Sequence, residues 1–395
     1  MNNKYITGLG LMILPLFVYA QTVLKTMKRL PDTGVKNSYT TTPGEDNDFN
    51  INAPFYLNHG NGTATDTITG LMWQLGDGGE MTVENAAVYC DTLTLGGHSG
   101  WRLPNVHEAV SILNHQNANP ALDITVFAKT GAEYWWTSDK QVNDVAKVWC
   151  TNAGGGAGNH LKTESISAGG TKKFHVRAVR DITTPVSVEH FSIASPSTVI
   201  DNLTGLMWRR QFLSDTLTWE SALTHADTAA TAGFTDWRLP NIKEIQSIMD
   251  VSRINPCLNT SYFTAIPAMK CWASTTLPNK TGSAWYLDTR FGITTYDVKT
   301  RRNYVYLVRT ADVASSAVKQ YNKGFQGVVY PNPFNNAFRV EGIGENTYCK
   351  LYNNSGVFLH RFKSGTLVSL PNLPAGCYYL KADGMARAIR VIKQQ

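Results

Sequence analysis

The chain has 395 residues, of which 43% are hydrophobic and 17% charged, and its formal net charge is +6 at pH 7. This length allows two or three packed domains. The positive charge is modest and spread along the sequence, which favours polyanions in general but lacks the basic tract of a nucleic-acid-binding protein. We therefore predict no nucleic-acid partner.

The first twenty residues have the pattern of an export signal. Lys4 gives a positive start, an apolar run extends from Ile6 to Val18, and Ala20 ends a small-residue cleavage site. The run is shorter than the ~20 apolar residues of a membrane-spanning helix, and no later stretch approaches that length. The sequence predicts a signal peptide over residues 1–20 and no transmembrane segment.

The following sequence contains one long unit written twice. The motif DTITGLMW returns about 135 residues later as DNLTGLMW, the motif WRLPN followed by Glu returns intact, and each copy closes on Val-Arg. The matched segments are Asp66 to Trp73 with Asp201 to Trp208, Trp101 to Glu108 with Trp237 to Glu244, and Val179-Arg180 with Val308-Arg309. Two copies of this length indicate two tandem domains.

Each copy starts with a polar turn and a short buried strand that carries Trp73 or Trp208. A helix is expected next, with Thr82 or Thr218 as its N-cap. The motif WRLPN then reads as a short strand that buries its tryptophan and leucine. The remainder of each copy is predicted to form short strands broken by Gly, Asn and Lys turns.

The WRLPN motif also positions an arginine in each copy. Trp101 and Trp237 are predicted to lie in the core, with Arg102 and Arg238 at the edge of the strand. We expect each arginine to hold a fixed hydrogen bond to a loop carbonyl or an acid, because it lies inside a short apolar strand. Contact with a ligand is the alternative.

A second helix begins directly after this strand. Asn105 and Glu108 have the spacing of an N-cap and its third helical residue, as do Asn241 and Glu244. Such a pair forms a capping box, in which the asparagine and the glutamate each accept a backbone amide hydrogen bond. This role explains the spacing fully and is favoured over that of a catalytic carboxylate.

These motifs resemble the DUF1566 family, also called the Lcl C-terminal domain, whose hallmarks are a TGLMWQ-like start, WRLPN with a following Glu, a Trp-Ser segment and a closing Val-Arg. The resemblance covers roughly residues 30 to 310 and implies two domains, over 30–181 and 190–310. It further implies an α+β fold similar to the C-type lectin-like and formylglycine-generating-enzyme group. The family's named member group binds sulfated glycosaminoglycans as a bacterial surface adhesin.

The C-terminal segment, residues 325–395, follows a polar linker over 311–324. It alternates apolar and polar residues, with Pro-Asn-Pro and Asn-Asn-Ser-Gly as turns. It resembles the type IX secretion C-terminal sorting domain, which implies a small antiparallel β-sandwich recognised by the secretion machinery. That resemblance also implies passage through the periplasm to the outer cell surface or the medium.

The six cysteines are expected to form disulfides, since their number is even and export leads to an oxidising compartment. Six cysteines allow 15 pairings, so we assign pairs by domain only. The sequence contains no CxxC and no histidine pair at zinc-ligand spacing. The expected pairs are Cys90 with Cys150, Cys257 with Cys271, and Cys349 with Cys377.

No set of residues points to an enzyme. The sequence lacks HExxH, GxSxG, a P-loop and a GxGxxG after a strand. The stretch Asp46 to Asn50 imitates the start of an EF-hand loop, but Ile51 and Leu57 stand where glycine and the bidentate glutamate are needed. We predict no metal and no cofactor.

Binding remains the favoured function, with an anionic or sulfated extracellular polysaccharide as the expected partner. Arg and Lys forks hold sulfates or carboxylates, and aromatic faces pack on sugar rings. Candidate residues are Trp149, Lys172 and Lys173 in the first copy and Trp285, Tyr286, Lys299, Arg301 and Arg302 in the second. An extracellular enzyme with an unrecognised site and a structural surface or matrix component are the alternatives.

Overall fold

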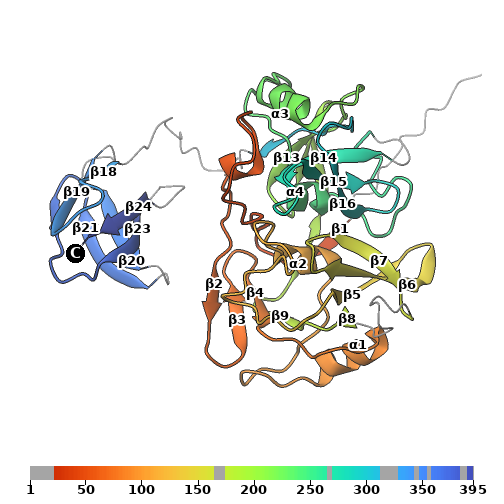
Figure 1. Ribbon diagram of the computed structural model, residues 1–395, viewed down its shortest axis with the longest axis horizontal. Coiled ribbons are helices and arrows are strands. Elements are labelled where there is room, and N and C mark those ends of the chain that lie inside the picture. Colours follow the sequence, from red (N-terminus) through yellow and green to blue (C-terminus); the bar gives the residue numbers. More distant parts are fainter. Residues whose placement is uncertain are drawn as a thin grey trace, which may run out of the picture. The chain divides into compact units, whose positions relative to one another are not determined.

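The computed structural model describes residues 22–163, 174–264, 269–311, 328–341, 347–353, 357–382 and 389–394 (Figure 1). The chain divides into two compact units, Met1–Val313 and Ala314–Gln395. The expected signal peptide, nearly all of the expected linker, and Lys172 and Lys173 lie outside the described residues. No described helix has the length and apolar character required to cross a membrane.

The first sequence repeat contains eight strands and two helices within its described part. In chain order they are β2 (Tyr56–Asn58), β3 (Thr63–Asp66), β4 (Leu71–Gln74), α1 (Val83–Thr92), α2 (Val106–Ser111), β5 (Tyr134–Gln141), β6 (Asp144–Asn152), β7 (Ala157–Leu161), β8 (Phe174–His175) and β9 (Val179–Asp181).

The second repeat follows the same order after β10 (Val186–Glu189). Its elements are β11 (Phe191–Ser195), β12 (Thr198–Asp201), β13 (Leu206–Arg209), α3 (Trp219–Asp227), α4 (Ile242–Ser247), β14 (Lys270–Thr276), β15 (Ser283–Asp288), β16 (Ile293–Val298) and β17 (Val308–Thr310).

Each repeat is built on two small sheets. The opening and closing strands form one sheet, in the order β2-β3-β4-β9 and β11-β12-β13-β17. The remaining strands form the second, in the order β7-β6-β5-β8 and β14-β15-β16. Trp73 lies opposite Val179, and Trp208 opposite Val308, so the strand of the closing Val-Arg pairs with the strand of the LMW motif in each repeat.

The fold class expected from the family resemblance is wrong. The structure is mostly β, with 39% of residues in strands and 10% in helices, arranged in many small sheets. It is not an α+β C-type lectin fold. The helices α1 to α4 are only six to ten residues long.

Both repeats contribute to one continuous hydrophobic core. It contains Trp73 and Val106 of the first repeat together with Trp208 and Ile245 of the second, all buried. Helices α2 and α4 contact each other where the repeats meet, and Figure 1 shows them facing across this boundary. The two repeats therefore fold as one unit that shares apolar surface.

A segment before the first repeat runs along both repeats. Its strand β1 (Thr22–Lys25) pairs antiparallel with β10, and its short 3-10 helix η1 spans Asp46–Asp48. The His115 amide donates to the Thr33 carbonyl at 2.9 Å on the first repeat, and Thr275 Oγ1 donates to Asp46 Oδ2 at 2.6 Å on the second. We call residues 22–50 the N-terminal segment.

The second unit consists of two antiparallel sheets around one core that includes Val340, Leu351 and Leu380. The sheet orders are β18-β19-β22 and β21-β20-β23-β24. The strands are β18 (Val328–Tyr330), β19 (Ala337–Glu341), β20 (Tyr348–Asn353), β21 (Phe358–Lys363), β22 (Leu367–Ser369), β23 (Gly376–Ala382) and β24 (Ile389–Lys393).

The expected disulfides are absent from the described structure: neither Cys90 with Cys150, nor Cys257 with Cys271, nor Cys349 with Cys377 is bonded. The third pair shows the reason most clearly. Cys349 lies opposite Ala382, five residues along β23 from Cys377. Five residues of strand span about 17 Å, whereas a disulfide needs Cα atoms within about 7 Å.

The other four cysteines lie within the apolar cores of the repeats. Cys90 and Cys150 belong to the core beneath α1, and Cys257 and Cys271 to the core that both repeats share. Burial raises the pKa of the Cys90 thiol to about 12 and raises that of Cys271 well above its usual value. Buried thiols of this kind behave as small apolar side chains.

Both capping boxes are present. Asn105 Oδ1 accepts the Glu108 amide at 2.9 Å while Glu108 Oε2 accepts the Asn105 amide at 2.9 Å. Asn241 and Glu244 repeat this arrangement with the same distances.

The same glutamates hold the arginines of the WRLPN motif, which forms one isolated β-bridge in each copy, Arg102 with Val179 and Arg238 with Val308, in place of the expected short strand. Arg102 Nη1 and Nη2 donate to Glu108 at 2.7 and 2.8 Å, and its other edge reaches Asp181. Arg238 donates to Glu244 at 2.5 and 2.6 Å. The Arg238 side chain is 5% exposed, against 33% for Arg102. The expected fixed partner of each arginine is therefore an acid.

This difference predicts unequal costs for the same substitution. Glu244→Gln preserves the cap but leaves the buried Arg238 cation without a carboxylate, and we expect a loss of about 3–5 kcal/mol in the free energy of unfolding. Glu108→Gln leaves Arg102 with Asp181 and solvent, and a loss of about 1–2 kcal/mol is expected. Urea denaturation of both variants measures the difference, and equal losses would refute it.

Candidate functional site

The aromatic residues predicted to contact a ligand are mostly core residues. Trp149 is 1% exposed and Trp285 3%, and both belong to the core that the repeats share. Trp285 also packs edge-on against His115 of the first repeat, with ring centroids 5.5 Å apart. These two tryptophans join the repeats and do not form a surface for sugar rings.

Strand geometry separates the remaining candidates. Trp285 and Tyr286 are neighbours on β15, so their side chains point to opposite faces of the sheet. Lys299 is buried, and its ammonium lies 3.7 Å from the centroid of the Trp219 ring. Burial lowers the pKa of Lys299, which is engaged by the core and not by solvent.

Two adjacent predicted cations, Arg301 and Arg302, do lie at the surface, whereas Tyr286 is buried in the core of the second repeat. Arg301 is exposed, and its Nε is 3.4 Å from Asp297 Oδ1. Lys270 Nζ approaches the other oxygen of Asp297 at 3.8 Å and lies 5.0 Å from the centroid of the Tyr286 ring. Arg302 is exposed beside Arg301. We call Lys270, Tyr286, Asp297, Arg301 and Arg302 the cationic cluster.

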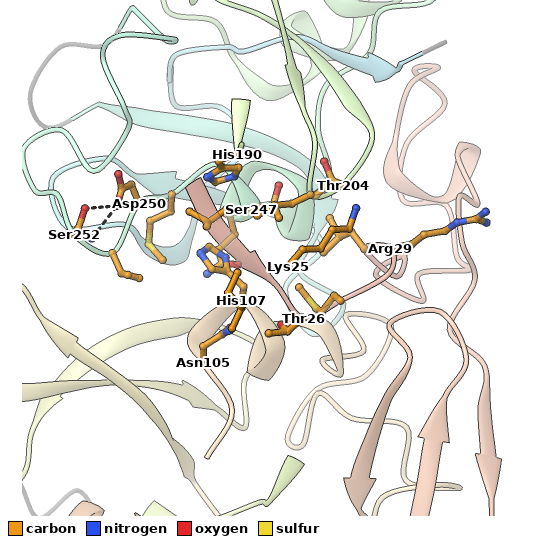
Figure 2. Close-up of a pocket in the computed structure, with 18 residues that line it drawn as sticks. Lys25, Thr26, Arg29, Asn105, His107, His190, Thr204, Ser247, Asp250 and Ser252 are labelled. Carbon is orange, nitrogen blue, oxygen red and sulfur yellow. Dashed lines mark hydrogen bonds between the residues drawn. The ribbon is translucent and has the colours of Figure 1, made fainter. Parts of the chain in front are cut away.

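A pocket of about 250 Å³ lies where the N-terminal segment meets both repeats (Figure 2). The N-terminal segment contributes Val23 to Met27, Arg29 and Leu30, α2 contributes His107, and the second repeat contributes His190 and Met249 to Ser252. Lys25 Nζ is anchored to the Asn202 carbonyl at 2.9 Å. Most of the wall is apolar, with a few polar groups that could orient a ligand.

The two imidazoles in this pocket both have a lowered pKa. Burial lowers the pKa of His190 to about 3, and the nearby His107 lowers it further. Burial likewise lowers the pKa of His107. His190 Nε2 lies 3.6 Å from Asp201 Oδ1, too far for a hydrogen bond. The pocket thus combines an apolar wall with two imidazoles and the side chains of Lys25, Arg29 and Asp250.

Neither histidine was predicted as a site residue, because neither recurs at the matching position of the other copy. His107 corresponds to Lys243, and the two residues stand at the same position of the facing helices α2 and α4. Each side chain reaches the opposite repeat: Lys243 Nζ donates to the Ser111 carbonyl at 2.8 Å, and His107 lines the pocket with Met249. A difference between the copies at matched positions, such as His107 against Lys243, was the sequence signal that could have indicated this pocket.

A second mismatch between the copies is a polar network found in the first repeat. His175 Nδ1 lies 3.0 Å from Asp77 Oδ1, and the buried Arg177 donates to the carbonyls of residues 74–76. The corresponding residues of the second repeat are the aromatics Phe212, Tyr304 and Tyr306, which contact one another.

Within the described residues, no group of three His, Cys, Asp or Glu has the arrangement of a metal site.

The N-terminal segment buries several charges against the second repeat. Lys243 is fully buried, and its ammonium also donates to the Asp32 carbonyl at 2.9 Å. Asp46 is 2% exposed and accepts hydroxyl hydrogen bonds from Thr33 and Thr275. Burial raises the pKa of Asp46 to about 8, with Asp32 raising it further. Burial lowers the pKa of Lys243 to about 8.

The raised pKa of Asp46 predicts a pH-dependent stability. Between about pH 4 and pH 8 the folded chain holds a proton at Asp46 that the unfolded chain has lost, so the stability that Asp46 contributes falls as pH rises through this window. Asp32, with a pKa of about 6, acts in the same direction over its lower part. Asp46→Asn supplies a neutral group at every pH, and we expect it to flatten the dependence.

Urea midpoints of the unchanged protein and of Asp46→Asn at pH 5, 6 and 7 provide the measurement. Lys243 is charged in both states below about pH 7 and does not contribute there. Parallel midpoint curves for the two proteins would contradict the assignment of the proton to Asp46.

Comparison with known proteins places these repeats in a family. The model of the Lcl C-terminal domain matches residues 62–180 and again residues 197–309. No curated protein matches the chain.

Among solved structures, one match is PorZ of Porphyromonas gingivalis, described as an essential bacterial surface component of the type IX secretion system. The two chains are 14% identical with a TM-score of 0.16, and the match covers 66% of this chain and 30% of PorZ. So low a TM-score carries no inference about this chain. The two family matches together span more than half of the sequence, and the chain belongs to the Lcl C-terminal domain family, with that domain present twice.

Proposed function

We propose that this protein is an adhesin-like binding protein, secreted or held at the cell surface, that recognises an anionic or sulfated polysaccharide. The cationic cluster of the second repeat is the observation that carries this proposal. It places Lys270 and Arg301 at the two oxygens of Asp297, with the exposed Arg302 next in sequence and Lys270 against the ring of the buried Tyr286.

The chemistry of the cationic cluster suits a sulfate or carboxylate group. Strands β14 to β16 hold Lys270 and Asp297 in a fixed register, and the Arg301 side chain remains 68% exposed. Both cations paired with Asp297 are largely exposed, although the Asp297 side chain itself is 13% exposed, and such solvent-facing cations can also pair with a sulfate. Guanidinium groups bind such oxyanions through paired N–H donors.

Removing the arginines should weaken binding to a sulfated polymer. We expect Arg301→Ala with Arg302→Ala to raise the Kd for heparin about tenfold, since two exposed charge contacts are worth roughly 1–2 kcal/mol. Binding of the unchanged protein should also weaken with added salt. Biolayer interferometry on immobilised heparin measures both effects.

Two control variants sharpen this test. Lys129→Ala with Lys140→Ala removes the same net charge from exposed positions of the first repeat and should leave the Kd nearly unchanged. Asp297→Asn removes the competing carboxylate and should strengthen binding. Equal losses in the two double variants would mean that net charge acts alone, and the assigned site would be abandoned.

We infer that export uses both ends of the sequence. The pattern of residues 1–20 supports a signal peptide, and the resemblance of residues 325–395 to a type IX sorting domain supports delivery by that machinery. The compact unit over Ala314–Gln395, with its two antiparallel sheets and separate core, supports an independent sorting module.

Deletion of residues 325–395 should therefore stop export at the periplasm. In a bacterium with a type IX system, we expect the full chain at the cell surface or in the medium and the truncated chain in the periplasmic fraction. Immunoblotting of cell fractions provides the measurement. Undiminished surface display of the truncated chain would rule out this role for the C-terminal unit.

A further inference from the structure

The N-terminal segment fills a surface on the second repeat. Thr40 Oγ1 donates to Glu220 Oε2 at 2.9 Å on α3. The backbone at Gly44 lies against Leu223, where an added Cβ would stand 3.7 Å from the Leu223 carbonyl oxygen. Residues 40–49 thus lie directly over this helix, and Leu223 is fully buried beneath them.

The same loop covers the arginine and the strand beside that helix. The guanidinium carbon of Arg238 lies 5.2 Å from the centroid of the Phe49 ring. Glu45 Oε1 accepts a hydrogen bond from Thr276 Oγ1 at 2.7 Å. A peptide segment with a glycine and an aromatic residue is therefore the natural occupant of this surface.

The corresponding surface of the first repeat is open. Ala87 corresponds to Leu223 and is exposed, and Arg102 corresponds to Arg238. These two residues, with Trp101, Leu103 and Asp181, line a cleft of about 490 Å³. Leu24 and Thr26 of the N-terminal segment also line this cleft, while Ala87 on its α1 wall remains exposed.

The charges that line the cleft of the first repeat differ from those at the matching surface of the second repeat. Asp181 stands where the second repeat has Thr310, and Asp91 adds a further carboxylate to the cleft wall. Arg102 already donates hydrogen bonds to Asp181 and to the buried Glu108, so these two carboxylates outweigh its single charge, and Asp91 is unpaired with it. The cleft is acidic, and a basic segment complements it.

We propose that the cleft over α1 and Arg102 is a docking site for an extended, basic segment of another protein. The apolar wall of Ala87, Trp101 and Leu103 receives the backbone and an apolar side chain of that segment, as α3 receives residues 40–49. Asp91 and Asp181 pair with its lysine or arginine side chains. This site lies on the other repeat from the cationic cluster and binds the opposite charge, so it is independent of the proposed polysaccharide site.

A peptide that copies the chain's own loop with two substitutions tests the proposal. The probe is fluorescein-labelled Ser38 to Asn50 with Asp46→Lys and Asp48→Lys, which keeps Gly44 and Phe49 and supplies two cations. Fluorescence anisotropy with the full chain should show saturable binding that weakens with salt. The unchanged Ser38 to Asn50 sequence should bind at least tenfold more weakly, because its aspartates face Asp91 and Asp181.

Two neighbouring substitutions on α1 locate the site. Ala87→Trp places a large side chain in the cleft, whereas Val88→Trp changes the adjacent exposed residue, which does not line it. Both positions are exposed, so folding should be retained. We expect Ala87→Trp to weaken probe binding at least tenfold and Val88→Trp to leave it unchanged.

Three results would overturn the proposal. They are no binding of the probe, equal binding by both variants, and concentration-dependent dimerisation of the unchanged chain that Ala87→Trp abolishes. In the last case light scattering would identify a second copy of this chain as the occupant of the cleft.

Discussion

In each repeat one glutamate both caps a helix and pairs with an arginine, and the rest of the fold depends on this carboxylate. Glu244 caps the start of α4 and neutralises Arg238 of the preceding WRLPN segment. Glu108 does the same for α2 and Arg102. The β-bridge of that segment, the helix and the tight turn between them are thereby fixed to one another. Residues engaged in this way are unavailable for a ligand, which leaves recognition to parts of the repeats that do not match.

The N-terminal segment makes the two repeats unequal. It covers Arg238 with Phe49 and buries Asp46 and Lys243, all without a counterpart on the first repeat. Burial holds the pKa of the aspartate up and that of the lysine down, because charged forms lose their hydration there. The first repeat instead keeps Arg102 partly exposed in an acidic cleft. One sequence motif therefore serves a sealed interface in one copy and an accessible surface in the other.

Contacts between the repeats create features that neither repeat has alone. The shared core joins the tryptophans of both copies, and the pocket around His107 and His190 exists only where α2, the N-terminal segment and the second repeat meet. The cationic cluster, in contrast, belongs to the second repeat alone, and its arginines are exposed. The chain thus carries an apolar pocket, an acidic cleft and a cationic surface at three separate places.

The sequence by itself determined the local features. The repeat and the capping boxes follow from short-range spacing, because helix capping is decided within a few residues. The same spacing allowed an acid as the hydrogen-bond partner of each arginine. Only the tertiary structure decided the fold class, the absence of the expected disulfides, and which residues reach solvent. Adjacent residues such as Trp285 and Tyr286 share a composition signal yet point to opposite faces of a strand. Both are buried, Trp285 in the core that the repeats share and Tyr286 in the second repeat's other core, and spacing along one strand does not encode this long-range packing.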